Sequence, residues 1–184
     1  MRVLAGALKG QRLATPKGRT TRPTADQVRI ACLDTLMPYL EAGPFLDLFA
    51  GAGGVGIEAL SRGAPSAVFV ERDREAARAL EDNIARLGLT DRARFLRQDV
   101  SRALVALGRE AARFAVVFLD PPYAASDGVS ALETIARGDC LLPAAVVVAQ
   151  HPTKAPLPAA PGLLTHWKDR RFGETTLTFF RGGA

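Results

Sequence analysis

The chain has 184 residues, of which 48% are hydrophobic and 23% are charged, and its formal net charge at pH 7 is +5. This length and composition predict one domain with a full hydrophobic core and a small appendage. No apolar run approaches the roughly 20 residues of a membrane span, and the first residues lack the long apolar core of a signal peptide. These features argue against a membrane protein, so we expect a cytoplasmic one.

The positive charge is concentrated at the N-terminus, because residues 1–30 carry a net charge of +6 and the remainder carries −1. The basic residues of this segment are Arg2, Lys9, Arg12, Lys17, Arg19, Arg22 and Arg29. Clustered cations bind polyanions by neutralising phosphates and releasing counterions, whereas a solubilising tail would carry the same charge without a partner. We favour a basic polyanion-binding arm over residues 1–23, attached to a main domain over residues 24–184.

The first predicted elements are short. Residues 2–5 and 11–14 are β-like and separated by glycines, which predicts a small hairpin followed by a loop. Thr24 has a glutamine three residues further on, which is the spacing of a capping box. The apolar residues that follow fall mostly on one helical face, so we expect a helix over residues 25–40 whose last turn is disturbed by Pro38.

From residue 44 onward, short apolar runs alternate with helical stretches, as in a series of βαβ units. The expected strands cover residues 44–50, 67–71, 94–97, 115–119 and 145–149, and the expected helices cover residues 54–62, 73–87, 101–110 and 128–137. The last two of these strands are apolar at every position, which is typical of a parallel sheet covered on both faces. Closing strands at 163–168 and 174–181 complete a doubly wound, mostly parallel, seven-stranded α/β sheet with an antiparallel hairpin at its edge.

The cysteines form no recognisable motif. Cys32 and Cys140 have no C-x-x-C partner, and His151 and His166 are the only histidines. The chain therefore lacks the spacing of a zinc site and the framework of a disulfide-stapled domain. We expect both cysteines to be reduced packing residues, and we expect no metal.

A glycine-rich turn joins the first predicted strand to the helix after it. Gly51, Gly53 and Gly56 permit tight backbone geometry and let main-chain N–H groups approach a ligand. Glu71 ends the next strand, 20 residues after Gly51, where it suits hydrogen bonds to a ribose diol. The spacing predicts a nucleotide-cofactor site, although an NAD or FAD site would show the same glycine pattern.

Two further acids favour S-adenosylmethionine as the cofactor. Asp47 is placed to face the positively charged sulfonium and amino group, and it would repel a dinucleotide pyrophosphate. Asp99 ends the third strand, where it could accept from the adenine amine or cap the following helix. The sequence leaves both roles of Asp99 open.

The fourth predicted strand ends in Asp120-Pro121-Pro122-Tyr123, at the sheet edge where ligands bind. An amine conjugated into a purine ring is a poor nucleophile, so we expect Asp120 and the Pro121 carbonyl to accept its N–H hydrogens. The prolines fix φ, and Tyr123 would stack on an extruded base. A proline-rich turn without function is the alternative, and the glycine-rich turn upstream argues against it.

The chain resembles the amino-methyltransferases, and the segments 47–56 and 120–123 look like their motifs I and IV. Further segments narrow the resemblance to the RsmD family, and these are residues 2–6, 9–13, 22–24, 26–29, 57–64 and 171–177. The resemblance covers nearly the whole chain. It implies a Rossmann-like class I methyltransferase that acts on N2 of one guanine in 16S ribosomal RNA, in assembled or nearly assembled small subunits.

The motifs and the resemblance together give the expected site residues. The catalytic residues are Asp120, Pro121, Pro122 and Tyr123, and the cofactor residues are Asp47, Ala50, Gly51, Gly53, Glu71, Arg72, Asp99, Val100 and Asp120. The RNA-binding residues are Lys9, Arg12, Arg19, Arg22, Pro23 and Thr24, of which the last three would lie near the target nucleotide. The chain departs from the family pattern at Ala52, where serine is common, and at Gln150, where glutamate is frequent.

Other functions stay open on the residues alone. The same chemistry would serve adenine N6 in DNA or N5 of a protein glutamine, although no separate DNA-recognition domain is evident. An NAD-dependent oxidoreductase or an inert RNA-binding module would share the scaffold. We favour guanine-N2 methylation of small-subunit ribosomal RNA because the basic arm and the resemblance agree on it, and we expect a monomer.

Overall fold

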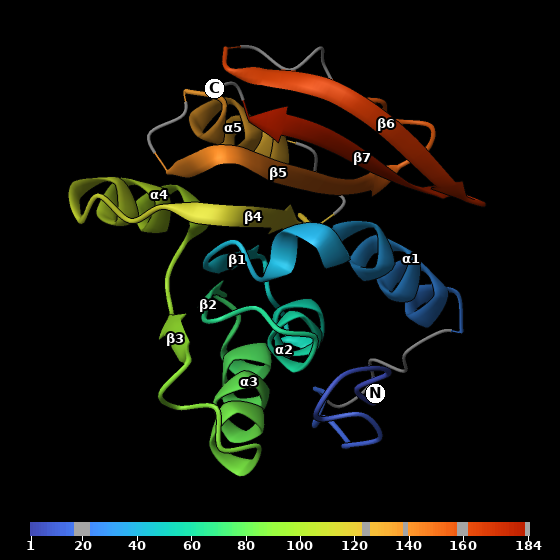
Figure 1. The fold of residues 1–184 in the computed structure, drawn as a ribbon, viewed down its shortest axis with the longest axis vertical. Coiled ribbons are helices and arrows are strands. Elements are labelled where there is room, and N and C mark those ends of the chain that lie inside the picture. The colour runs from blue at the N-terminus through green and yellow to red at the C-terminus, as the bar shows by residue number, and fades with distance from the viewer. Residues whose placement is uncertain (17–22, 123–125, 138–139, 158–161, 183–184) are drawn as a thin grey trace.

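The fold is one seven-stranded sheet with helices on both faces (Figure 1). The computed structural model describes residues 1–16, 23–122, 126–137, 140–157 and 162–182. The strands are β1 (Phe45–Leu48), β2 (Ala67–Val70), β3 (Ala93–Leu96), β4 (Phe114–Leu119), β5 (Leu141–Pro152), β6 (Leu164–Phe172) and β7 (Thr175–Gly182). The helices are α1 (Pro23–Leu40), α2 (Gly54–Ser61), α3 (Arg74–Arg86), α4 (Val100–Arg109) and α5 (Ser126–Ile135).

The strand order is β3-β2-β1-β4-β5-β7-β6. Strands β1 to β5 run parallel, and β7 pairs antiparallel with both β5 and β6. The predicted doubly wound, mostly parallel sheet with an antiparallel edge hairpin is therefore confirmed. Its order reverses between β1 and β4, and in open α/β sheets ligands bind at the carboxyl ends of strands beside such a reversal.

Two hydrophobic layers cover the sheet. Helices α1, α2 and α3 pack on one face, and α4 and α5 pack on the other. All six residues of β4 are buried, which explains why this strand is apolar at every position. Cys32 and Cys140 are both buried, as expected of packing residues. Among the described helices, none is long and apolar enough to cross a membrane.

Several element boundaries differ from the predictions by one or more residues. Helix α1 begins at Pro23, so Thr24 lies in its first turn and not at its N-cap. The helix ends at Leu40, as predicted, because a proline so near the C-terminus removes only one hydrogen bond of the last turns. Strand β5 extends to Pro152, since it pairs with β7 beyond the apolar run on which its prediction rested.

The predicted N-terminal hairpin is present in a short form, with an antiparallel bridge between Arg2 and Arg12 and backbone hydrogen bonds on both sides of it. Residues 1–16, here called the N-terminal segment, also direct backbone groups toward the main domain (Figure 1). The Leu4 and Ala5 N–H groups each donate to a Glu58 carboxylate oxygen at 2.8 Å. Glu58 is buried and also accepts from Arg62, so its charge is compensated.

The buried Asn83 side chain on α3 joins the N-terminal segment to the glycine-rich turn. Its amide nitrogen donates to the carbonyl oxygens of Ala14 and Ala52, at 3.0 Å each. Its oxygen accepts from the Ala14 N–H at 2.7 Å and from Arg86 at 3.0 Å. Because a carboxamide has two donor hydrogens and two acceptor lone pairs, its whole capacity is used.

Replacing Asn83 by aspartate tests this junction. Asn83→Asp keeps the shape but directs a carboxylate oxygen at the Ala14 and Ala52 carbonyl oxygens. We expect the free energy of unfolding to fall by about 3 kcal/mol or more, because buried polar groups lose their partners. Urea denaturation measures the change. The control is Asp82→Asn at the neighbouring exposed position, expected to change stability by less than about 0.5 kcal/mol. Equal stability of Asn83→Asp and wild type would contradict the role of Asn83.

Candidate active site

A cavity of about 560 Å³ opens at the carboxyl ends of the parallel strands. This volume is in the usual range of small-molecule sites, roughly 300–1,000 Å³. The predicted site residues that line it are Ala50, Gly51, Glu71, Arg72, Asp99, Val100, Asp120, Pro121 and Pro122. Residues from four separate turns, predicted from separate motifs, therefore share one cavity.

The glycines of the turn after β1 serve different purposes. Gly51 lines the cavity with φ of 56°, and a Cβ there would meet nothing within 4 Å, so the turn leaves its cavity side open. Gly53 does not line the cavity; it precedes α2 with φ of 84°. A Cβ at Gly56 would collide with the Phe69 ring, so this glycine permits α2 to approach β2.

Glu71 connects the ends of β1 and β2. One carboxylate oxygen accepts from the Gly51 N–H at 2.8 Å, and the other accepts from the Asp73 N–H at 2.7 Å. Glu71 thus holds the glycine-rich turn in place from the wall of the cavity. Each carboxylate oxygen has two acceptor sites, so Glu71 can also accept hydrogen bonds from the two hydroxyls of a ribose.

Asp47 lies behind the cavity wall and not among its lining residues. Its side chain is buried, and Oδ2 accepts from the Gly56 N–H at 2.8 Å. Burial raises the pKa of Asp47 from 3.8 to about 7; the Gly56 hydrogen bond opposes this rise, and the charges of Asp120 and Glu71 add to it. The bond to Gly56 fixes the start of α2, and the direct cofactor contact of Asp47 stays a prediction.

The raised pKa of Asp47 predicts a pH-dependent stability. The folded protein holds a proton that the unfolded chain releases near pH 3.8, so stability falls as pH rises toward 7 and is constant above it. The loss amounts to at most about 4 kcal/mol. Asp47→Asn cannot ionise and keeps an acceptor for Gly56, so the variant should gain on wild type between about pH 4 and 7 in denaturation experiments. A constant difference over this range would contradict the burial of an ionisable Asp47.

Asp99 is the N-cap of α4 and also lines the cavity. Its Oδ1 accepts from the Ser101 N–H and hydroxyl, and its Oδ2 lies 3.1 Å from Arg72 Nη1. These Ser101 hydrogen bonds and the nearby Arg72 charge lower the pKa of Asp99 below its usual value. The helix-capping alternative is therefore present in the structure, and an adenine contact would use the remaining acceptor capacity of the carboxylate.

The turn after β4 brings Asp120, Pro121 and Pro122 to the cavity. The Asp120 N–H donates to the Leu48 carbonyl oxygen at 3.4 Å, which ties this turn to the end of β1. A Cβ at Gly128 would approach the Pro121 ring to 2.5 Å, so glycine at this position lets α5 pack on the turn. Tyr123 lies outside the described residues.

The predicted RNA-binding residues are placed only in part. Lys9 and Arg12 are exposed on the N-terminal segment. Arg19 and Arg22 lie outside the described residues, and so do the side chains of Pro23 and Thr24 in the first turn of α1. Lys9 and Arg12 are therefore the predicted RNA-binding residues whose side chains the structure describes. Both lie on the N-terminal segment, whose backbone is held by Asn83 and Glu58.

Several cavity residues were not predicted from the sequence. They are Phe49, Val70, Asp73, Gln98, His151, Pro152 and Thr175, together with Gln150, for which no role was assigned. Phe49 has φ of 62°, an unfavourable value for a bulky residue that often marks a functional turn. Position near the carboxyl end of a parallel strand was the available signal for Phe49, Gln98 and Gln150. Thr175 had none, because only its pairing with Pro152 brings it to the cavity.

The cavity is suited to a cationic organic ligand. Three carboxylates line it, those of Glu71, Asp99 and Asp120, and the guanidinium of Arg72 lines it as well. Carboxylates at this density attract a positive charge and disfavour a phosphate. Across the described residues, no group of three or more His, Cys, Asp or Glu side chains could hold a metal ion.

The chain is similar to several known proteins over most of its length. The family model described as Conserved hypothetical protein 95 matches residues 1–181. YlbH of Bacillus subtilis (strain 168), provisionally named as an rRNA methyltransferase, is 38% identical over 98% of each chain. The Ribosomal RNA small subunit methyltransferase D of Haemophilus influenzae is 31% identical over 85% of this chain and 81% of its own length. The solved Escherichia coli structure of yhhF, provisionally named as a methyltransferase, has a TM-score of 0.87 and 26% identity, covering 100% of this chain and 98% of that one.

Proposed function

Because the chain belongs to the Conserved hypothetical protein 95 family, which is the RsmD family of methyltransferases, we propose that it methylates N2 of a guanine in small-subunit (16S) ribosomal RNA. The methyl donor is S-adenosylmethionine. The observation that carries the proposal is the placement of the Asp120-Pro121-Pro122 turn in the same cavity as the glycine-rich turn, Glu71 and Asp99. The Asp120 turn would bind the acceptor amine, and the glycine-rich turn with Glu71 and Asp99 would bind the nucleoside of the cofactor in the same cavity.

The chain's own residues can hold the cofactor. S-adenosylmethionine supplies an electrophilic methyl group on a positively charged sulfur. Glu71 would accept hydrogen bonds from the ribose, and Asp99 would face the adenine amine. The backbone of Gly51 leaves room for close approach, and the three carboxylates of the cavity favour a cation. Asp47 would act through the shape of the glycine-rich turn, because its bond to Gly56 anchors α2.

The turn after β4 would position the acceptor. The guanine amine donates its two hydrogens to an Asp120 carboxylate oxygen and the Pro121 carbonyl oxygen, which directs the nitrogen lone pair at the methyl group. A new N–C bond forms as the S–C bond breaks, and the nitrogen then releases one proton, for which Asp120 is the nearby acceptor. Tyr123 would stack on the base.

The role of Asp120 predicts a selective loss of chemistry. Asp120→Ala should lower turnover by more than about a hundred-fold, because the amine is no longer oriented, while S-adenosylhomocysteine still binds. Cells lacking the gene are complemented with wild type, Asp120→Ala or the exposed-site control Asp91→Ala. Mass spectrometry of small-subunit RNA then measures N2-methylguanosine, and calorimetry measures S-adenosylhomocysteine binding.

Three outcomes of this experiment would contradict the proposal. Restoration of N2-methylguanosine by Asp120→Ala would remove Asp120 from the chemistry. An unchanged N2-methylguanosine content in cells lacking the gene would point to adenine or glutamine as acceptor. Binding of NADH in place of S-adenosylhomocysteine would assign the cavity to an oxidoreductase.

We propose that the N-terminal segment contacts the RNA backbone. Lys9 and Arg12 are exposed, and the backbone around them is fixed to α2 and α3 through Glu58 and Asn83. A fixed segment loses little conformational entropy when it binds RNA. The substrate would be an assembled or nearly assembled small subunit in the cytoplasm, and the enzyme would act as a monomer.

The segment's role predicts a change in salt dependence. Lys9→Ala combined with Arg12→Ala should weaken binding of small-subunit particles and reduce the slope of log K against log[salt] by about 2, roughly one for each phosphate that is no longer neutralised. The control combines Arg102→Ala with Arg109→Ala, two exposed arginines on α4 on the other face of the sheet. A slope that stays the same, or that falls equally in the control, would return the segment to a solubilising role.

A further inference from the structure

A second cavity, of about 300 Å³, lies beside the first on the sheet face that carries α5. Strands β6 and β7 form its floor, and Pro156 and Leu157 of the loop after β5 close one side. His151 lines both cavities, so the two are neighbours separated by one side chain. Neither the glycine-rich turn nor the Asp120 turn contributes to this second cavity.

The strand register explains which side chains face the second cavity. His166 pairs with Phe180, Asp169 with Thr178, and Arg171 with Thr176. Paired residues of antiparallel strands point to the same face of the sheet. His166 and Asp169 are three positions apart and would normally point to opposite faces. The register shift between His166 and Lys168 brings both to the cavity side.

Polar groups in the second cavity are held in a network. His166 Nε2 lies 3.0 Å from Asp169 Oδ1, and His151 Nε2 lies 2.9 Å from the Thr178 hydroxyl. Burial raises the pKa of Asp169, but the hydrogen bonds from His166 and Thr178 outweigh it and hold the pKa below its usual value. Asp169 is therefore a carboxylate at neutral pH. The network orders the side chains before any ligand arrives.

The charges of the second cavity favour a neutral polar ligand. Arg171 contributes a cation and Asp169 an anion, so the site is not a simple phosphate pocket. A nucleobase carries both donors and acceptors along its edge, and its flat face stacks on histidine rings and arginine planes. His166 and Arg171 are both exposed and offer such surfaces. A cavity of about 300 Å³ has room for one base.

We propose that this second cavity binds the base of a nucleotide that flanks the target guanosine in the RNA strand, with Arg171 and His166 as its stacking partners and Asp169 as an acceptor. The inference rests on the proposed function, since it requires an RNA substrate in the first cavity. Binding of the flanking base would hold the strand while the target base enters beside Asp120. The role of these residues is in substrate affinity and not in the methyl transfer itself.

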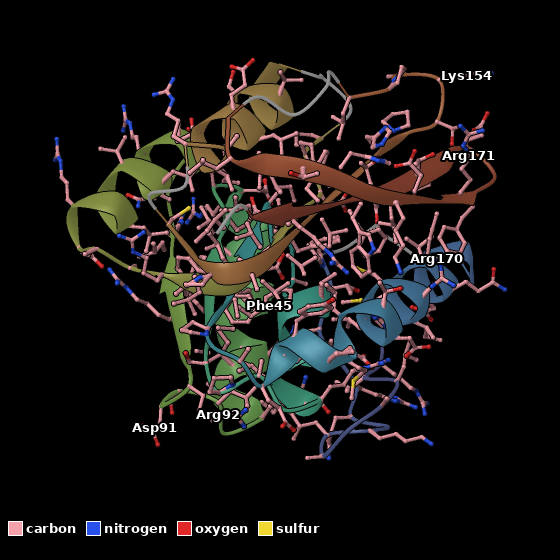
Figure 2. All side chains as sticks on the ribbon, turned by 45° about the horizontal axis from the view of Figure 1, so that its top comes forward. Phe45, Asp91, Arg92, Lys154, Arg170 and Arg171 are labelled. Atoms are coloured by element: carbon pink, nitrogen blue, oxygen red, sulfur yellow. The ribbon has the colours of Figure 1, made fainter. Side chains whose placement is uncertain are left out.

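Arg171 and Arg170 provide a matched pair of variants. They are neighbours on β6 with the same side chain, but Arg170 lies on the other face, where it donates to the Ala31 carbonyl oxygen of α1 at 3.0 Å. Figure 2 shows Arg171 on the side of the sheet where Lys154 lies, and Arg170 beside α1. Each substitution by alanine removes one positive charge from the same strand, and the Arg170 variant also removes the bonds to α1.

The experiment measures methylation of small-subunit particles from cells that lack the gene. Arg171→Ala should raise KM for the particles by about ten-fold through the loss of one stacked base, with kcat and the affinity for S-adenosylhomocysteine within about two-fold of wild type. Arg170→Ala should leave KM within about two-fold. Arg171→Lys should behave like Arg171→Ala, because a lysine keeps the charge but has no planar face.

Salt dependence separates a base from a phosphate. The slope of log KM against log[salt] should be the same for Arg171→Ala and wild type. A slope reduced by about one, with Arg171→Lys active as wild type, would assign a phosphate contact to Arg171 and overturn the base assignment. An unchanged KM in Arg171→Ala, or an equal rise in Arg170→Ala, would also overturn it. Failure of the wild type to methylate the particles would instead refute the proposed function.

Discussion

The buried carboxamide of Asn83 is the constraint on which the arrangement of the site depends. It bonds to Ala14 of the N-terminal segment and to Ala52 of the glycine-rich turn, with no hydrogen-bonding capacity left over. A buried amide without hydrogen-bond partners raises the free energy of the folded state, so separating the two segments is unfavourable. The surface proposed to meet RNA and the turn proposed to meet the cofactor are therefore joined by hydrogen bonds into one unit, although about 40 residues of chain lie between them.

Buried carboxylates organise the rest of this unit. Glu58 accepts two backbone N–H groups of the N-terminal segment, and Asp47 accepts the Gly56 N–H at the start of α2. Their electrostatic situations differ, because Glu58 lies beside Arg62 whereas Asp47 lies near the carboxylates of Glu71 and Asp120. The charges of Glu71 and Asp120 add to the effect of burial on Asp47, and a cationic cofactor would relieve this repulsion.

Catalysis and substrate binding can be divided between two neighbouring cavities. The first is formed by the ends of the parallel strands and contains the groups suited to methyl transfer. The second is formed by the antiparallel strands β6 and β7, where a register shift turns His166 and Asp169 to one face. The antiparallel edge is therefore more than a closure of the sheet. It supplies a polar surface next to the proposed reaction site, and His151 lines both cavities.

The sequence by itself determined the sheet, the glycine-rich turn and the turn at Asp120, because these depend on local patterns: apolar runs, glycine spacing and prolines after a strand. It could not determine that Asp47 is buried behind the cavity or that Asn83 and Glu58 hold the N-terminal segment. Thr175 and Arg171 likewise reach their cavities only through strand pairing. These features depend on contacts between residues far apart in the chain, and only the tertiary structure fixes which distant groups satisfy one another's hydrogen bonds and charges.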